Sequence, residues 1–319
     1  VGGVVQILTR RPQRLAAQAL ADGGSLGTGR LSLFAGARPR GWSYTAAGEW
    51  FTTDGYVLVD RAQRGPIDAR AGSTHRSLLA TLGRHGDNGW HFEAGANVFT
   101  EARQNGTPAV DNSTASRRAW AEGTIPLRQG TRGFISTRVF GGTQGYDQAF
   151  SAVSADRTSE DINRRQRIPT SVVGASAQWV HALGPHVVIA GTDLRWIDGR
   201  TQETRIAQGR VLGFTDDGGR QQTASIFLQD TWQAGARTTL IAGVHADGWH
   251  TQANNTAYDK TLTAVNPRLS ASVAVAPAVS LRGSVYGGFR APTLNELYRG
   301  FRTGNTQVNP NEALAPERL

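Results

Sequence analysis

The chain has 319 residues and a formal net charge of +9, with no cysteine and no methionine. Without cysteine there is no disulfide framework and no thiol chemistry, and no apolar run approaches the roughly 20 residues of a membrane-spanning helix. The basic residues, almost all arginine, are scattered singly, which argues against nucleic-acid binding. Scattered arginines would suit the inside and rim of a pore that meets anionic solutes, or simply a solvated protein surface.

Alternation of polar and apolar residues predicts thirteen strands along the chain. Successive side chains of a strand point to opposite faces, so Trp90, Phe92 and Val98 share an apolar face while His91 and Glu93 share a polar one. Most of these strands exceed the roughly 9–11 residues that a tilted barrel strand needs to cross a bilayer. The predicted strands are 14–22, 25–37, 41–53, 73–84, 89–102, 115–126, 131–143, 168–181, 185–199, 220–232, 237–250, 264–276 and 278–290.

The connections between these strands alternate between short and long. Short connections, each with the Gly or Pro that a tight reversal needs, are expected at 38–41, 86–89, 127–130, 182–185, 233–236 and 276–278. Long polar loops are expected at 54–72, 103–114, 144–167, 200–219 and 251–263, and only 22–25 is short on that side. This pattern predicts an all-β protein, an antiparallel transmembrane β-barrel with short periplasmic turns and long extracellular loops.

Tryptophans fall near the ends of the predicted strands. In a barrel they would form the aromatic girdles that lie at the two membrane interfaces. In a soluble β-sandwich they would cap the core, and the asymmetry of the loops favours the girdles. The residues concerned are Trp42, Trp50, Trp90, Trp179, Trp196, Trp232 and Trp249.

No pattern in the sequence indicates an enzyme. The seven histidines are dispersed without metal-ligand spacing, and nucleophile-elbow, phosphate-loop and dinucleotide motifs are missing. We therefore expect no catalytic residue, no metal site and no cofactor.

The predicted loop 144–167 is the richest candidate for ligand binding. Arginine can grip anionic oxygens with two hydrogen bonds and aromatic rings can stack on planar ligands, so this loop would suit an anionic metal chelate. The alternative is a solvated loop whose arginines form internal ion pairs with Asp156, Glu160 and Asp161. The candidate residues are Tyr146, Phe150, Arg157, Arg164, Arg165 and Arg167.

Val1–Arg10 is similar to the segment that closes the plug of TonB-dependent outer-membrane receptors. Phe289–Tyr298 is the most specific match, and resembles the segment where these receptors run from a strand into a large loop. Further matches are Gly55-Tyr56 with Arg64-Gly65-Pro66, Asn105–Pro108, Ser154–Glu160, Asn309-Pro310 and Pro316-Glu317.

The resemblance implies a barrel of roughly 22 strands in the outer membrane of a Gram-negative bacterium. It also implies an N-terminal plug and energised uptake of a ferric siderophore, haem or cobalamin, driven through TonB. The expected domains are 1–12, the end of the plug, and 13–319, part of the barrel. The expected partners are TonB (through the missing N-terminal part), the metal chelate or cobalamin, and outer-membrane lipid and lipopolysaccharide.

We therefore expect an internal fragment, since the rest of the plug and about nine strands fall outside this sequence. Thirteen strands alone would leave two edges of unpaired amides in lipid, at several kcal/mol per group, so this segment should not transport by itself. A passive porin and an adhesive, structural or soluble lectin-like β-protein are the alternatives. The plug-like start argues against the porin.

Overall fold

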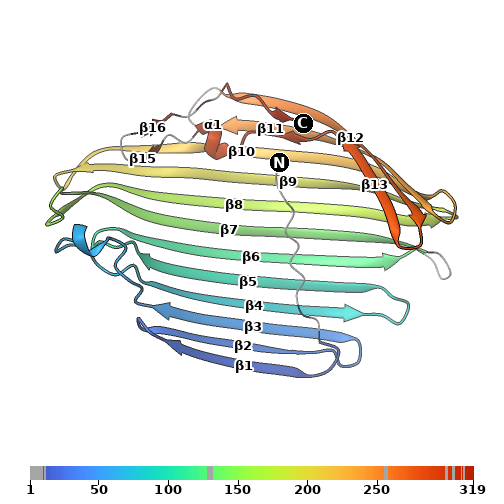
Figure 1. Ribbon diagram of the computed structural model, residues 1–319, viewed down its shortest axis with the longest axis horizontal. Helices are drawn as coiled ribbons and strands as arrows, with labels where there is room; N and C mark the ends of the chain where they lie inside the picture. Colours follow the sequence, from blue (N-terminus) through green and yellow to red (C-terminus); the bar gives the residue numbers. More distant parts are fainter. Residues whose placement is uncertain are drawn as a thin grey trace.

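The computed structural model describes residues 10, 12–127, 132–254, 258–298, 301–303, 306–309, 311 and 313–319. Thirteen strands form one antiparallel sheet in which each strand pairs with the next along the chain (Figure 1). The predicted all-β antiparallel architecture is confirmed. Apart from Arg10 and Pro12, the expected end of the plug lies outside the described residues, as does most of the turn 127–130.

The strands of the sheet grow longer toward the middle of the chain (Figure 1). They are β1 Ala16–Gly24, β2 Thr28–Ala37, β3 Trp42–Thr53, β4 Ser73–His85, β5 His91–Gln104, β6 Asp111–Pro126, β7 Gly133–Val153, β8 Glu160–Leu183, β9 His186–Ala207, β10 Arg210–Gln233, β11 Thr238–Ala253, β12 Asp259–Ala276 and β13 Val279–Tyr286. The remaining elements are the 3-10 helix η1 Arg61–Gln63, the helix α1 Leu294–Tyr298, and the strands β14 Phe289–Arg290, β15 Phe301–Thr303, β16 Thr306–Val308 and β17 Glu317–Arg318.

Three of the expected long loops are mostly strand, among them 251–263, of which 251–253 belong to β11 and 259–263 to β12. Segment 144–167 belongs to β7 and β8 except for a hairpin connection at 154–159, and 200–219 belongs to β9 and β10 except for a two-residue turn. That turn is Gln208-Gly209, with both residues at positive φ, 49° and 72°, as a two-residue hairpin turn requires. Polar side chains fall on both faces of 144–167 and 200–219, and the apolar residues of 200–219 include the consecutive Val211 and Leu212, so alternation does not reveal these segments as strands. Their backbones nevertheless continue the ladder of the strands below.

The sheet has an apolar outer face at the level of the shorter strands. On β4, Leu78 and Leu82 are 57% and 52% exposed and alternate with side chains that face the other way. Arg76 and Arg84 lie on the same face as these leucines and flank them. The two arginines are about 26 Å apart along the strand, which at a tilt of about 40° is about 20 Å of height, within the roughly 25 Å apolar band of a membrane barrel. The facing assigned from the sequence is therefore consistent with the structure.

The inner face of the sheet carries paired polar groups. The His75 Nε2 atom lies 3.0 Å from Glu49 Oε1, and Ser32 Oγ donates a hydrogen bond to Glu49 at 3.0 Å. Farther along the sheet, Ser225 Oγ donates to Asp247 at 2.6 Å. These groups satisfy one another across neighbouring strands, which stabilises polar residues away from bulk water.

Most of the predicted girdle tryptophans lie on the outer face. Trp42, Trp50, Trp196 and Trp232 are 40–44% exposed there. Trp249 is an exception to the prediction, because the register of β11 turns it to the inner face, where its ring stacks 4.4 Å from Phe289. None of the helices among the described residues has the length and apolar character needed to span a membrane.

The facing of β5 can be tested in the full-length protein with two neighbouring substitutions. Ala96 is exposed on the outer face midway along the apolar band, and we expect Ala96→Arg to destabilise the barrel by about 2–4 kcal/mol. Asn97 lies on the inner face and donates to Leu78 O at 3.1 Å, so Asn97→Arg should cost about 1 kcal/mol. Denaturant unfolding in liposomes measures both, and equal costs would contradict the assigned facing.

Candidate functional site

The upper halves of β9 and β10 stand beyond the apolar band. Past Trp196, the outer face becomes charged: Arg220 Nε lies 2.8 Å from Asp198, and Arg200 lies 3.7 Å from Asp198 and 3.9 Å from Asp216. Ion pairs of this kind suit water or headgroups and not hydrocarbon. The inner face at the same height therefore forms the outer mouth of the lumen.

Two of the sequence-predicted residues, Arg164 and Phe150, meet on this inner face, and a third, Tyr146, faces the same side four residues before Phe150 on β7. The Arg164 guanidinium lies 4.1 Å from the centroid of the Phe150 ring and 3.6 Å from a Glu203 oxygen. Its Nε atom is buried and has no hydrogen-bond partner among the described residues. Tyr146 projects to the same face, and its hydroxyl accepts a hydrogen bond from Asn112 Nδ2 at 2.9 Å. Charge and aromatic surface thus come together as the sequence suggested.

A second arginine completes this cluster. Arg205 lies directly opposite Arg164 in the pairing of β8 with β9, and Gln166 lies opposite Glu203 and donates a hydrogen bond to it. Like charges directly opposite one another on neighbouring strands destabilise a sheet. The Glu203 carboxylate pairs with Arg164 and lies two residues before Arg205, on the same face of β9. We call Arg164, Arg205, Glu203 and Phe150 the mouth cluster. No sequence pattern indicated Arg205, because only the register of β8 and β9 brings it opposite Arg164.

Arg165 and Arg167 do not join the mouth cluster. Both lie in β8, where alternation turns them to the outer face, although the sequence placed them in a loop. Arg167 Nε lies 3.9 Å from Asp147, and both side chains are more than half exposed. An exposed pair at this distance contributes little to stability.

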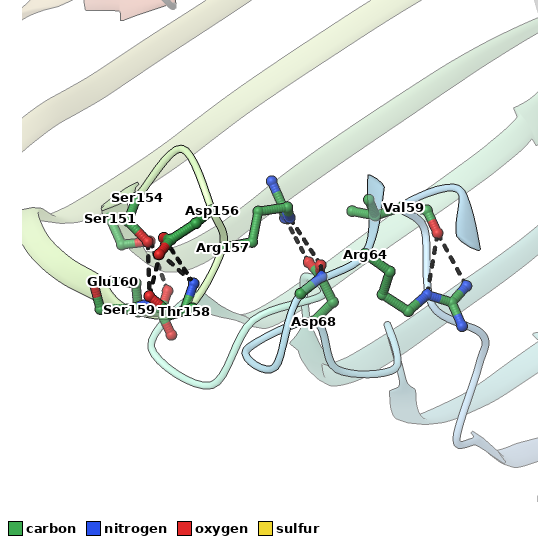
Figure 2. A network of polar contacts seen from close by, with 11 residues as sticks. Val59, Arg64, Asp68, Ser151, Ser154, Asp156, Arg157, Thr158, Ser159 and Glu160 are labelled. Carbon is green, nitrogen blue, oxygen red and sulfur yellow. Dashed lines mark hydrogen bonds and ion pairs between the residues drawn. The ribbon is translucent and has the colours of Figure 1, made fainter. Parts of the chain in front are cut away.

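Arg157 is engaged in a different contact. It lies in the connection between β7 and β8, and its guanidinium donates to Asp68 in two hydrogen bonds, at 2.8 Å from Nε and 2.5 Å from Nη2 (Figure 2). The Asp68 side chain is inaccessible to solvent and also accepts from Gly65 N at 2.8 Å. These contacts, that with Arg157 foremost, lower the pKa of Asp68 to about 2, and Asp68 in turn raises the pKa of Arg157.

Backbone hydrogen bonds reinforce this contact and bring in a third loop. Ile67 N donates to Arg157 O at 3.3 Å, and Ala69 N donates to Gly106 O at 2.8 Å. A β-carbon on Gly65 would collide with the Arg157 backbone, so this close approach requires glycine. We call the connected segments 54–72, 105–110 and 154–160 the loop junction.

Glu160 provides a second connection within the loop junction, through hydrogen bonds to both of its carboxylate oxygens. It accepts from Ala109 N at 2.7 Å through Oε1 and from Ser151 Oγ at 2.7 Å through Oε2. Three motifs that lie far apart in the sequence thus meet in one structure. Among the described residues, no group of three or more His, Cys, Asp or Glu side chains is arranged to hold a metal ion.

Residues 15–319 match the family model described as "TonB dependent receptor-like, beta-barrel". The chain belongs to this family. Receptors of the family are outer-membrane transport barrels of Gram-negative bacteria. The resemblance seen in the sequence is therefore confirmed. No curated protein matches the chain in sequence.

Solved structures of TonB-dependent receptors share the fold. The copper transporter OprC aligns with a TM-score of 0.77 and 16% identity over 98% of this chain and 50% of its own. The Serratia marcescens hemophore receptor HasR, in complex with its hemophore HasA and haem, aligns with a TM-score of 0.67 and 15% identity over 95% of this chain and 49% of its own. BauA, the ferric preacinetobactin receptor of Acinetobacter baumannii, aligns with a TM-score of 0.66 and 13% identity over 98% of this chain and 51% of its own. The chain spans about half the length of these receptors, and at such identities the likeness establishes the fold alone.

The buried ion pair of the loop junction can be tested by removing its charge in the full-length receptor. We expect Asp68→Asn to loosen all three loops, because the Arg157 guanidinium would keep at most one good acceptor. Hydrogen exchange at the amides of Ile67 and Ala69 should then accelerate. Asp22→Asn, at the exposed tip between β1 and β2, is the control. Equal exchange in both variants would show that Asp68 does not hold the loops.

The lowered pKa of Asp68 predicts how the loop junction responds to acid. A carboxyl whose pKa falls on folding stabilises the structure above its ordinary value, 3.8, and loses that stabilisation as the pH approaches about 2. Spin labels at Gln63 and Ala155 should therefore keep their separation between about pH 7 and about pH 5 and separate only near about pH 2. A widening that is already complete at about pH 5 would contradict this assignment.

Proposed function

We propose that this chain is the barrel portion of an outer-membrane receptor for energised uptake of a ferric siderophore, haem or cobalamin. The observation that carries the proposal is the mouth cluster. Arg164 and Arg205 lie directly opposite one another on β8 and β9, Glu203 pairs with Arg164, and Phe150 offers an aromatic surface beside Arg164. An anionic chelate that bridges the two guanidinium groups would relieve their repulsion. This favours ferric siderophores and haem over cobalamin as cargo.

In this proposal, the mouth cluster performs the first step of uptake. The ligand binds through charge-assisted hydrogen bonds to the arginines and by contact with Phe150 and Tyr146. Arg157 serves to hold the rim in shape, because its guanidinium is committed to Asp68. Movement of the plug, driven through TonB, would then admit the ligand to the lumen.

Two contacts support the proposed role of 1–12 as the end of a plug. The Arg10 guanidinium lies 5.0 Å from the centroid of the Phe34 ring, which is on the inner face of β2. A β-carbon on Gly36 would lie 3.0 Å from Pro12 Cγ on the same face. The chain therefore enters the sheet from its inner side, where a plug would lie.

The outer face supports a location in the outer membrane. Its apolar band would contact lipid, and the charged residues above Trp196, with Arg200 and Arg220 among them, would lie at the height of lipopolysaccharide headgroups. Lipopolysaccharide and TonB are thus proposed partners of the intact receptor.

The full-length receptor tests this function with ferric citrate, haemin and cyanocobalamin as probes. We expect an anionic chelate to bind, and Arg164→Gln or Arg205→Gln to weaken binding by roughly 10–100-fold, the cost of one charge-assisted contact. Arg165→Gln, on the outer face, is the matched control and should change affinity less than about twofold. Equal effects of Arg164→Gln and Arg165→Gln would exclude the mouth cluster as the site. Uptake that persists after a protonophore collapses the proton gradient would indicate a passive channel instead.

A further inference from the structure

Residues 289–298 cross the inner face of the sheet; we call them the strap. The Phe289 ring stacks on Trp249, and Gln221 Nε2 donates to Pro292 O at 3.3 Å. Figure 1 shows α1 lying over β10, with which it makes its main contacts. The strap therefore narrows the lumen beside β8, β9 and β10.

The sequence of the strap explains its fixed shape. Thr293 and Glu296 form a capping box: Thr293 N donates to Glu296 Oε2 at 2.8 Å, and Glu296 N donates to Thr293 Oγ1 at 3.3 Å. Arg290 lies 2.6 Å from the other oxygen of Glu296 and 2.7 Å from Glu317. These two ion pairs connect the start of the strap to the helix α1 and to β17.

The inner face of the sheet, here called the wall, has a hollow where the strap lies against it. Gly199 of β9 and Gly219 of β10 are directly opposite one another, and neither places a side chain on the wall. A β-carbon on Gly219 would lie 2.9 Å from the Tyr298 ring, and one on Gly199 would lie 3.7 Å from Leu294. Leu297 is 1% exposed. The helix is therefore anchored in the hollow.

Beside this anchor the strap and the wall leave an open cavity of about 270 Å³. Ile168, Ile197 and Leu294 line it with apolar side chains, and Thr201, Gln221 and Asn295 line it with polar ones. Sites that enclose a whole small molecule usually measure about 300–1,000 Å³. The cavity is thus suited to one ring or one short chain of a larger ligand.

The cavity lies below the mouth cluster on the same two strands. Ile168 follows Arg164 by four residues on β8, and Thr201 precedes Arg205 by four residues on β9. At about 3.3 Å per residue, the arginines stand roughly 13 Å above the cavity, on the same face. Asp217 also lines the cavity, and its carboxylate disfavours a second anionic group there.

We propose that this cavity is a second subsite, which takes an apolar or aromatic limb of an anionic ligand whose charged head lies between Arg164 and Arg205. The inference rests on the proposed function, because it assigns a ligand class to the mouth cluster. The ligand is an elongated amphiphile, with its negative charge at one end and a neutral ring or chain at the other.

Three probes and two variants of the full-length receptor in nanodiscs test this proposal. Phenylhexylphosphonate carries both the charge and the limb, inorganic phosphate carries the charge alone, and phenylhexanol carries the limb alone. Ile197→Trp fills the cavity from the wall. Ile241→Trp, on the inner face of β11 and outside the cavity lining, is the matched control.

We expect phenylhexylphosphonate to bind the wild-type receptor and the Ile241→Trp variant roughly tenfold more tightly than phosphate, the gain from burying one ring. Ile197→Trp should abolish that gain and the binding of phenylhexanol, and leave phosphate binding unchanged. A gain that survives Ile197→Trp, or is lost equally in Ile241→Trp, would overturn the subsite. Phosphate binding that is insensitive to Arg164→Gln and Arg205→Gln would instead overturn the proposed function, and phenylhexanol would still report on the cavity.

Discussion

The constraint on which this structure depends is that a backbone in a bilayer must satisfy its own hydrogen bonds. Each strand from β2 to β12 does so by pairing with both of its neighbours in chain order, and β1 and β13 pair on one side, with β2 and β12. Pairing also fixes the facing of side chains, because a slip of one residue would move every apolar side chain to the opposite face. The apolar band, the polar inner face and the position of the mouth cluster all follow from this register.

The same strands serve two purposes at two heights. Between Arg76 and Arg84 the sheet needs an apolar outer face, and the sequence alternates accordingly. Above Trp196 the strands carry charged and polar residues on both faces, together with exposed apolar residues of β10 such as Phe214. This upper region is where the inner face becomes free to carry a ligand-binding cluster.

Two kinds of contact shape the outer opening. In the first half of the chain, the Asp68–Arg157 pair and the surrounding backbone bonds join three loops into one rigid piece of rim. In the second half, the strap occupies the lumen and leaves a cavity against the wall. The mouth cluster lies on the strands between them, so ligand capture would occur against a fixed rim and beside a narrowed passage.

The sequence by itself determined the fold class, the strand faces in the apolar band and most of the tight turns. It could do so because alternation and turn residues are local signals. It also pointed to Phe150 and Arg164. It could not separate Arg164 from Arg165, since the strand character of 144–167 is hidden when both faces are polar. Only the tertiary structure placed Arg205 beside Arg164 and paired Asp68 with Arg157 across 89 residues, because register and loop contacts depend on partners that are distant in the chain.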